Sequence, residues 1–166
     1  FQLEIGTYSG VGTNYVAVTG VGTWVAITGS NVINNNGGWV HIAYSRDGVG
    51  NNHEIYINGI PQIINTNPYT FANNNALKEI GRGTTAIQNY DGQIDQVRIW
   101  DIALTQLEIQ NYINCPPTGN ELGLVGYWNF EEGSGTTAYD LTSNANDGAI
   151  NGATYDNNVP SQSCQL

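Results

Sequence analysis

Positive charge is scarce in this sequence. The 166 residues contain 4 Lys and Arg against 14 Asp and Glu, so the formal net charge is -10 at pH 7. Charged residues of both signs make up 11% of the chain, whereas an average soluble domain has about 25%. Binding to nucleic acid depends on Lys and Arg that neutralise phosphates and release counterions. The composition therefore argues against a nucleic acid partner.

Long apolar runs are also missing. No stretch of roughly 18 apolar residues could form a membrane-spanning helix, and no basic segment followed by an apolar run marks a signal peptide. We therefore expect no membrane insertion. The chain lacks an initiator Met and begins at Phe1, inside a predicted strand, which indicates a processed product or an excised fragment.

Cysteine is limited to Cys115 and Cys164, both in polar, Pro- or Ser-rich stretches without a His or Cys at metal-ligand spacing. A disulfide between them fits this setting. Two free buried thiols are the alternative, but free cysteines favour apolar surroundings. A bridge would stabilise the fold by about 3–4 kcal/mol. Together with the acidic composition, it predicts an extracellular or cell-surface location.

Gly and Asn are abundant instead, and they separate short β-rich runs. Both residues favour turns over helices. Period-two alternation, clearest at 14–18, 23–28 and 39–44, gives each strand one side that can face a core. The pattern predicts an all-β fold, an antiparallel β-sandwich or jelly roll. The predicted strands are 1–5, 14–18, 23–28, 39–46, 53–57, 60–64, 76–80, 93–100, 122–129 and 149–155.

Two local motifs are specific. Asn58-Gly59 lies between apolar runs and predicts a hairpin with a type I′ turn, because both residues tolerate φ > 0. One short helix is predicted over 105–113, with Thr105 as N-cap and Glu108 completing a capping box. Its apolar side consists of Leu104, Leu107, Ile109, Tyr112 and Ile113.

The helix is predicted to end at Cys115-Pro116-Pro117, and a polar linker follows at 118–120. These signals separate a main part, 1–117, from C-terminal strands, 118–166. About 45 residues are too few for an independent sandwich, and the cysteine bridge would tie the ends of the segment together. We therefore predict a single domain over 1–166.

Motifs in the middle of the chain carry a family resemblance. In order they are WVHIAY at 39–44, IYING at 55–59, Ile80-Gly81, DGQIDQVRIW at 91–100 and ALT at 103–105. Over residues 39–113 their order and spacing closely resemble the laminin-G-like jelly-roll domains of the concanavalin A-like lectin/glucanase superfamily. The resemblance implies a concanavalin A-like β-sandwich.

Residues 124–154 resemble the opening segment of the same family, so the order of segments differs from that of a complete domain. Either the chain is a fragment that lacks its front strands, or it is permuted so that the tail supplies them. We favour the fragment. Missing strands would leave an exposed sheet edge.

Some members of this superfamily are glycoside hydrolases, so the carboxylates need testing. Retaining glycosidases hold two carboxyl groups about 5–5.5 Å apart. Glu131 and Glu132 are adjacent and would point to opposite faces of a strand, and the other acids are scattered singly. Neither His41 nor His53 stands next to a Ser or Cys that it could activate. We expect no enzymatic activity.

A calcium site is a further candidate. The loop 140–148 is rich in oxygen donors and ends in a Gly, and similar loops often form Asx turns without a metal. Alternation places Asp95 on the face of Val97 and Ile99, predicted to point inward, with Gln96, Arg98 and Trp100 on the other. Asp95 would either accept loop amides or bind a cation. The candidate calcium ligands are Asp95, Asp140, Asn144, Asn146 and Asp147, and calcium is common among the members that the chain resembles.

Sugar binding requires flat aromatic faces with polar groups at their edges. Among the aromatic residues near predicted loops, Trp24 and Tyr90 are the candidates for ligand binding. The sequence thus predicts a secreted, non-catalytic module of a larger adhesin or polysaccharide-active protein. Its partner would be a polysaccharide or a cell-surface glycan or protein. The alternatives are a structural spacer without a ligand and, less favoured, a domain related to glycoside hydrolases.

Overall fold

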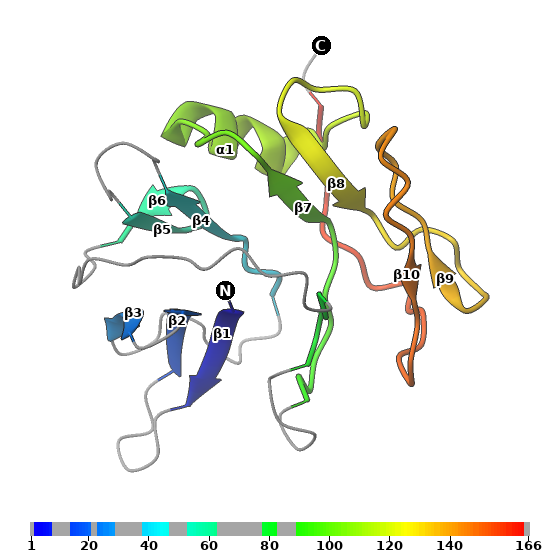
Figure 1. Cartoon of the computed structure of the whole chain (residues 1–166), viewed down its shortest axis with the longest axis horizontal. Helices are drawn as coiled ribbons and strands as arrows, with labels where there is room; N and C mark the ends of the chain where they lie inside the picture. The colour runs from blue at the N-terminus through cyan, green and yellow to red at the C-terminus, as the bar shows by residue number, and fades with distance from the viewer. Residues whose placement is uncertain are drawn as a thin grey trace. The chain divides into compact units, whose positions relative to one another are not determined.

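The computed structural model describes the backbone at residues 2–7, 14–20 and 23–28, and backbone and side chains at 38–46, 53–62, 78–82 and 89–164. The chain divides into two compact units, Phe1–Gly92 and Gln93–Leu166 (Figure 1). The boundary between the two units lies before Cys115-Pro116-Pro117, where the sequence predicted the end of the helix and of the main part. The single domain over 1–166 stays a prediction.

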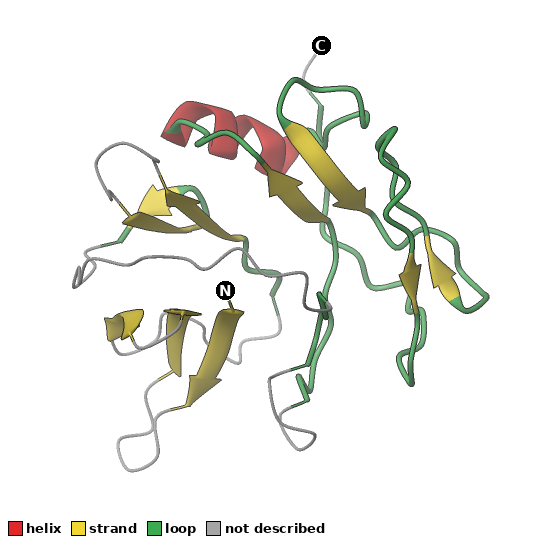
Figure 2. Ribbon diagram, viewed as in Figure 1, coloured by secondary structure: helices red, strands yellow, loops and turns green. Residues whose placement is uncertain are grey.

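Antiparallel strands dominate the described residues, with a single helix (Figure 2). This confirms the predicted all-β class. The elements are β1 (Gln2–Thr7), β2 (Asn14–Gly20), β3 (Thr23–Thr28), β4 (Ile42–Arg46), β5 (His53–Ile57), β6 (Ile60–Pro61), β7 (Val97–Trp100), α1 (Gln106–Asn114), β8 (Leu124–Trp128), β9 (Thr137–Ala138) and β10 (Gly148–Ala149).

The first unit contains a sheet in the order β1-β2-β3. Its register pairs Leu3 with Val18 and Val18 with Val25. Because side-chain positions alternate along a strand, the Leu, Ile and Val positions of all three strands fall on one face of this sheet. Trp24 pairs with Thr19 at positions of the opposite face. The alternation read from the sequence is therefore matched by the pairing.

The second sheet of this unit has the order β4-β5-β6, and β5 is its buried strand. Asn58 and Gly59 have φ values of 50° and 72°, which confirms the predicted turn with two positive φ angles. The turn is fixed to the residue before β4, because the backbone N–H of His41 donates to Asn58 Oδ1 at 2.9 Å and the Asn58 N–H donates to the His41 carbonyl at 2.9 Å.

The second unit is built on β7 and β8, which pair antiparallel and are flanked by α1 (Figure 1). The Tyr112 carbonyl of α1 accepts a hydrogen bond from Arg98 Nη1 at 2.6 Å. The Trp100 and Tyr112 rings lie 5.0 Å apart. Ile109 and Leu124 are buried here, at 4% and 7% exposure. The face of β7 that carries Arg98 and Trp100 is therefore the face that the helix contacts.

The helix follows the sequence prediction closely. Thr105 is the N-cap, and the capping box is complete: the Glu108 N–H donates to Thr105 Oγ1 at 3.3 Å, and the Thr105 N–H donates to Glu108 Oε2 at 2.7 Å. The helix ends at Asn114, with Cys115 as C-cap before the two prolines. No helix among the described residues is long and apolar enough to cross a membrane.

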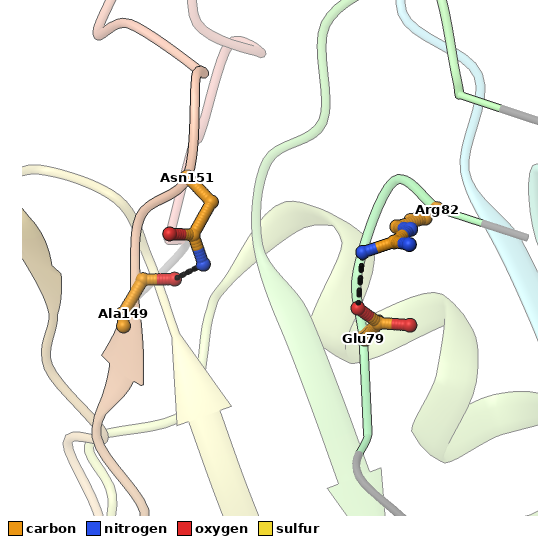
Figure 3. A network of polar contacts seen from close by, with 4 residues as sticks. All are labelled: Glu79, Arg82, Ala149 and Asn151. Atoms are coloured by element: carbon orange, nitrogen blue, oxygen red, sulfur yellow. Dashed lines mark hydrogen bonds and ion pairs between the residues drawn. The ribbon is translucent and has the colours of Figure 1, made fainter. Parts of the chain in front are cut away.

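Two predicted strands of the second unit are shorter in the structure. The strand predicted over 93–100 begins at Val97, because Gln96 has a φ of 55° that interrupts extended backbone. The strand predicted over 149–155 ends at Ala149. There Asn151 Nδ2 donates back to the Ala149 carbonyl at 3.4 Å (Figure 3), and Gly152 turns the chain with a φ of 83°.

The first unit shows the same kind of difference. The strand predicted over 60–64 is formed at Ile60–Pro61, whereas residues 63–64 lie outside the described residues. Residues 78–80 of the strand predicted over 76–80 are not extended in a sheet.

In the second unit, the short strand β9 pairs with β10 and was not predicted from the sequence.

The disulfide between Cys115 and Cys164 is formed, with a Cα–Cα distance of 4.5 Å across a sequence separation of 49. Beside it, the Ser163 N–H donates to the Asn114 carbonyl at 2.9 Å. The bridge therefore fixes the end of the chain to the C-terminus of α1, and the predicted cysteine pairing is confirmed.

Replacing Cys115 and Cys164 by Ser should lower the free energy of unfolding by about 4 kcal/mol, because a long loop is no longer closed in the unfolded chain. Chemical denaturation of the double variant and of the native protein measures the difference. Thiol titration of the native protein should detect no free cysteine, and two reactive thiols would contradict the bridge.

Candidate functional site

The loop from Asp140 to Asp147 brings together four of the five residues predicted as calcium ligands. Asp140 Oδ1 accepts hydrogen bonds from the backbone N–H groups of Tyr127 at 3.0 Å and Thr142 at 2.9 Å. Its Oδ2 accepts from the backbone N–H and the side-chain amide of Asn146, at 2.9 and 3.2 Å. Asp147 Oδ1 accepts the backbone N–H of Asp140 at 2.9 Å.

These hydrogen bonds occupy the Asp140 carboxylate, which is 8% exposed. A carboxylate offers about four acceptor positions, and four N–H groups point at this one. Burial by itself raises the pKa of Asp140, but the bonds from Thr142, Tyr127 and Asn146 outweigh it and hold the pKa below its usual 3.8. The arrangement supports the Asx-turn alternative, because it leaves no acceptor position for a cation. Calcium binding at this loop stays a prediction.

The same loop covers the edge of β8 that does not face β7. The Val125 carbonyl accepts side-chain amide bonds from Asn144 at 3.1 Å and Asn146 at 3.2 Å. The Tyr127 carbonyl accepts the backbone N–H of Leu141 at 2.8 Å. An uncovered edge would expose these groups to pairing with another chain. The loop therefore takes the place of a neighbouring strand.

Asp95, the fifth predicted ligand, precedes β7. Its Oδ1 accepts the Gln96 N–H at 2.8 Å, and its Oδ2 is buried without a hydrogen-bond partner among the described residues. Burial raises the pKa of Asp95 above 3.8 and the charge of Glu131 adds to this, while the Gln96 bond and the charge of Arg98 lower it. No hydrogen bond within the described part of the chain joins Asp95 to the 140–147 loop.

Arg98 lies on the face that was predicted to point outward, and the structure gives it several partners. Nη2 donates to Gln96 Oε1 at 2.8 Å, and the guanidinium lies 5.5 Å from the centre of the Tyr127 ring. Tyr127 donates to the same Gln96 oxygen at 2.6 Å. On the other face, Ile99 is 47% exposed. The prediction that this face points inward is therefore wrong at Ile99, because α1 covers the Arg98 side.

An exposed surface surrounds Tyr90, whose side chain is one of the two predicted sugar platforms. The Tyr90 N–H donates to the Gly81 carbonyl at 2.8 Å, and Arg82 forms an isolated antiparallel bridge with Asn89. Tyr90 is 42% exposed. A Cβ on Gly92 would lie 2.9 Å from the Tyr90 ring and hydroxyl, so the ring lies across this glycine. We call residues 78–82 and 89–92 the Tyr90 surface.

The Tyr90 surface also carries an ion pair that the sequence did not single out. Arg82 Nη1 lies 3.1 Å from Glu79 Oε1, and the two side chains are 50% and 44% exposed (Figure 3). The sequence signal for this pair is the spacing of two opposite charges, Glu79 and Arg82, three residues apart. Asn89 and Asp91, which adjoin Tyr90 in the chain, are also exposed, so this part of the chain combines an exposed aromatic ring with polar side chains.

Trp24, the second predicted platform, has its backbone in β3, opposite Thr19. The same face of the sheet carries the positions of Gln2, Glu4, Ala17 and Ala26, so the Trp24 position lies on the face opposite the Leu, Ile and Val positions. Its side chain lies outside the described residues.

Two of the groups considered for catalysis, Glu132 and His53, have structural partners. Glu132 Oε1 accepts the Tyr139 N–H at 2.7 Å, and its Oε2 accepts the Tyr155 hydroxyl at 3.0 Å. His53 is 3% exposed, and its Nδ1 lies 2.6 Å from the Tyr44 hydroxyl. Among the residues for which the structure gives positions, no three His, Cys, Asp or Glu side chains gather in a way that could hold a metal ion.

A laminin G family model, described as the concanavalin A-like lectin/glucanases superfamily, matches residues 2–110. The match covers the first unit and extends through β7 into α1. No curated protein and no solved structure matches the chain.

Replacing Asp140 by Asn should cost about 3 kcal/mol of stability, because the N–H donors would lose a charged acceptor and face an amide. Since the pKa of Asp140 is lowered in the folded state, its contribution is present above pH 3.8 and lost as the pH falls below that value. The stability difference between the two proteins should therefore shrink in acid, as followed by denaturation at several pH values.

Asp147→Asn is the matched control, because an Asn oxygen can still accept the Asp140 N–H. It should cost about 1 kcal/mol or less. Equal losses from both substitutions would contradict the central role of Asp140.

Thermal unfolding with millimolar calcium distinguishes the two interpretations of the loop, since a higher Tm supports a calcium site and an unchanged Tm supports hydrogen bonding alone.

Proposed function

The chain belongs to the concanavalin A-like lectin/glucanase superfamily, and from this premise we propose that it is a non-catalytic module that binds carbohydrate through the Tyr90 surface. The observation that carries the proposal is the exposed Tyr90 ring, which lies across Gly92. A pyranose ring presents an apolar face to an aromatic ring and its hydroxyls to polar groups at the edge. The exposed Tyr90 ring offers the apolar contact, and the exposed residues that adjoin it in the chain, Asn89 and Asp91, are polar.

A binding role without catalysis is supported by how the second unit uses its acids. Both oxygens of Glu132 accept hydrogen bonds within the fold, and Asp140 has no acceptor position left. Hydrolysis at a sugar would need two carboxyl groups that face the substrate. We propose that these acids stabilise loops. Release of reducing ends from a polysaccharide, abolished by substituting one acid, would overturn this part of the proposal.

The disulfide and the laminin-G-like family are compatible with an extracellular location. We propose that the module is secreted and belongs to an adhesin or a polysaccharide-active protein, with a polysaccharide or cell-surface glycan as its partner. A glycan array tests the binding role directly. A folded protein that binds none of the arrayed glycans would indicate a structural spacer instead.

Tyr90→Ala should weaken glycan binding about tenfold or more, because the ring supplies the apolar contact. Tyr139→Ala is the matched control, since Tyr139 is also an exposed tyrosine, at 54%, but belongs to the second unit. Titration calorimetry with a glycan identified on the array compares the two variants. Equal losses, or none from Tyr90→Ala, would remove Tyr90 from the site.

Gly92→Ala should reduce glycan binding several-fold while leaving Tm unchanged, because the new methyl group displaces the flexible Tyr90 ring rather than backbone. Gly38→Ala serves as its control, since a Cβ at Gly38 meets nothing within 4 Å. A drop in Tm for Gly92→Ala would mean that the substitution disturbs the fold and not the ring alone.

A further inference from the structure

Asn-Gly dipeptides occur in the chain at residues 36–37, 58–59 and 151–152. In such a dipeptide the backbone nitrogen of the glycine can attack the side-chain amide of the asparagine, because glycine has no Cβ to hinder the approach. The dipeptide at 36–37 lies outside the described residues. The structure places the other two in different surroundings, and their reactivity should differ accordingly.

The Asn58-Gly59 dipeptide is held in the turn between β5 and β6. Asn58 Oδ1 accepts the His41 N–H at 2.9 Å, and the Asn58 N–H donates to the His41 carbonyl at 2.9 Å. The turn is closed by the pairing of Ile57 with Ile60, and Gly59 is buried. Attack by the Gly59 nitrogen needs rotation of the Asn58 side chain and of the following backbone. This rotation breaks the Oδ1 bond and distorts the turn.

The Asn151-Gly152 dipeptide has no comparable restraint. Both residues are exposed, and they follow the end of β10 at Ala149. The Asn151 side chain makes one long hydrogen bond, from Nδ2 to the Ala149 carbonyl at 3.4 Å (Figure 3). Within the described residues the Gly152 N–H donates no backbone hydrogen bond, and a Cβ at Gly152 would meet nothing within 4 Å. The nitrogen that attacks and the amide that it attacks are therefore both open to solvent.

We propose that Asn151 is a site of spontaneous deamidation in the folded protein, and that the turn protects Asn58 from the same reaction. The Gly152 nitrogen forms a bond to Asn151 Cγ, and the bond between Cγ and Nδ2 breaks. Nδ2 leaves as ammonia and takes with it the proton of the Gly152 N–H. Water then opens the resulting five-membered succinimide ring at one of its two carbonyls, which gives aspartate or isoaspartate.

The products change an exposed segment and not the sheet beside it. Either product adds one negative charge to the net charge of -10. Isoaspartate also lengthens the main chain by one carbon, because the chain then runs through the former side chain. The pairing of Ala149 with Thr137 and the bond from the Ile150 N–H to the Thr136 carbonyl both precede Asn151. The β9–β10 pair should therefore remain after modification.

Peptide mapping of the full chain tests this proposal. The native protein is kept at physiological pH and temperature, and samples taken over several weeks are digested with a glutamate-specific protease. Mass spectrometry measures the conversion of amide to acid, and isoaspartyl methylation identifies isoaspartate. Asn151 should be converted about tenfold faster than Asn58 or more, because only Asn58 must lose the Oδ1 bond and the turn pairing.

Unfolded protein is the matched control. In concentrated urea with a reductant, Asn58 and Asn151 should be converted at similar rates, because both precede glycine and neither is held by the fold. Equal rates in the native protein, or no conversion of Asn151, would overturn the proposal. Continued protection of Asn58 in urea would show that the neighbouring sequence protects it, and would overturn the role of the turn.

Two variants separate the reaction from its consequence. Asn151→Gln should remove isoaspartate from the 151–152 peptide, because glutamine would have to close a larger ring. Asn151→Asp introduces the charge of the product and should leave Tm unchanged. A fall in Tm for Asn151→Asp would overturn the inference that the β9–β10 pair tolerates the modification.

Discussion

The buried carboxylate of Asp140 connects the parts of the second unit that lie far apart in the sequence. It accepts N–H groups from Tyr127 in β8 and from Thr142 and Asn146 in its own loop. A buried charge is tolerated only where hydrogen bonds replace water, and here four N–H groups do so. The loop that Asp140 holds then covers the edge of β8, so the two-stranded sheet is closed on that side without a further strand.

The proposed binding surface depends on a different physical feature, the exposed ring of Tyr90 that lies across Gly92. The second unit uses its acids for caps and turns, as Glu108 does at α1 and Asp140 does at β8. This unit contains a single basic residue, Arg98, and its side chain is partly buried. In the proposed function, recognition relies on the exposed aromatic face of Tyr90.

Local motifs were predicted well because neighbouring residues decide them. The Asn58-Gly59 turn, the Thr105 capping box and the strands 23–28 and 53–57 follow from backbone preferences and alternation within a few residues. Strand ends were predicted less well, since one positive φ, as at Gln96, shortens a strand that its apolar pattern would extend. Tyr90 was found as an exposed aromatic residue, whereas the ion pair of Glu79 and Arg82 was not predicted.

The sequence by itself determined the all-β class, the family resemblance, the disulfide and the general shortage of cations, because composition and short motifs encode them. Only the tertiary structure decided which face of β7 is covered, that Arg98 is partly buried, and that Asp140 has its acceptor positions filled. These outcomes depend on partners such as Tyr112 and Tyr127, which lie 14 and 13 residues away from the groups that they contact. An Asp-rich loop has the same sequence pattern whether its oxygens face a cation or backbone N–H groups, and the chain's path alone brings those N–H groups to it.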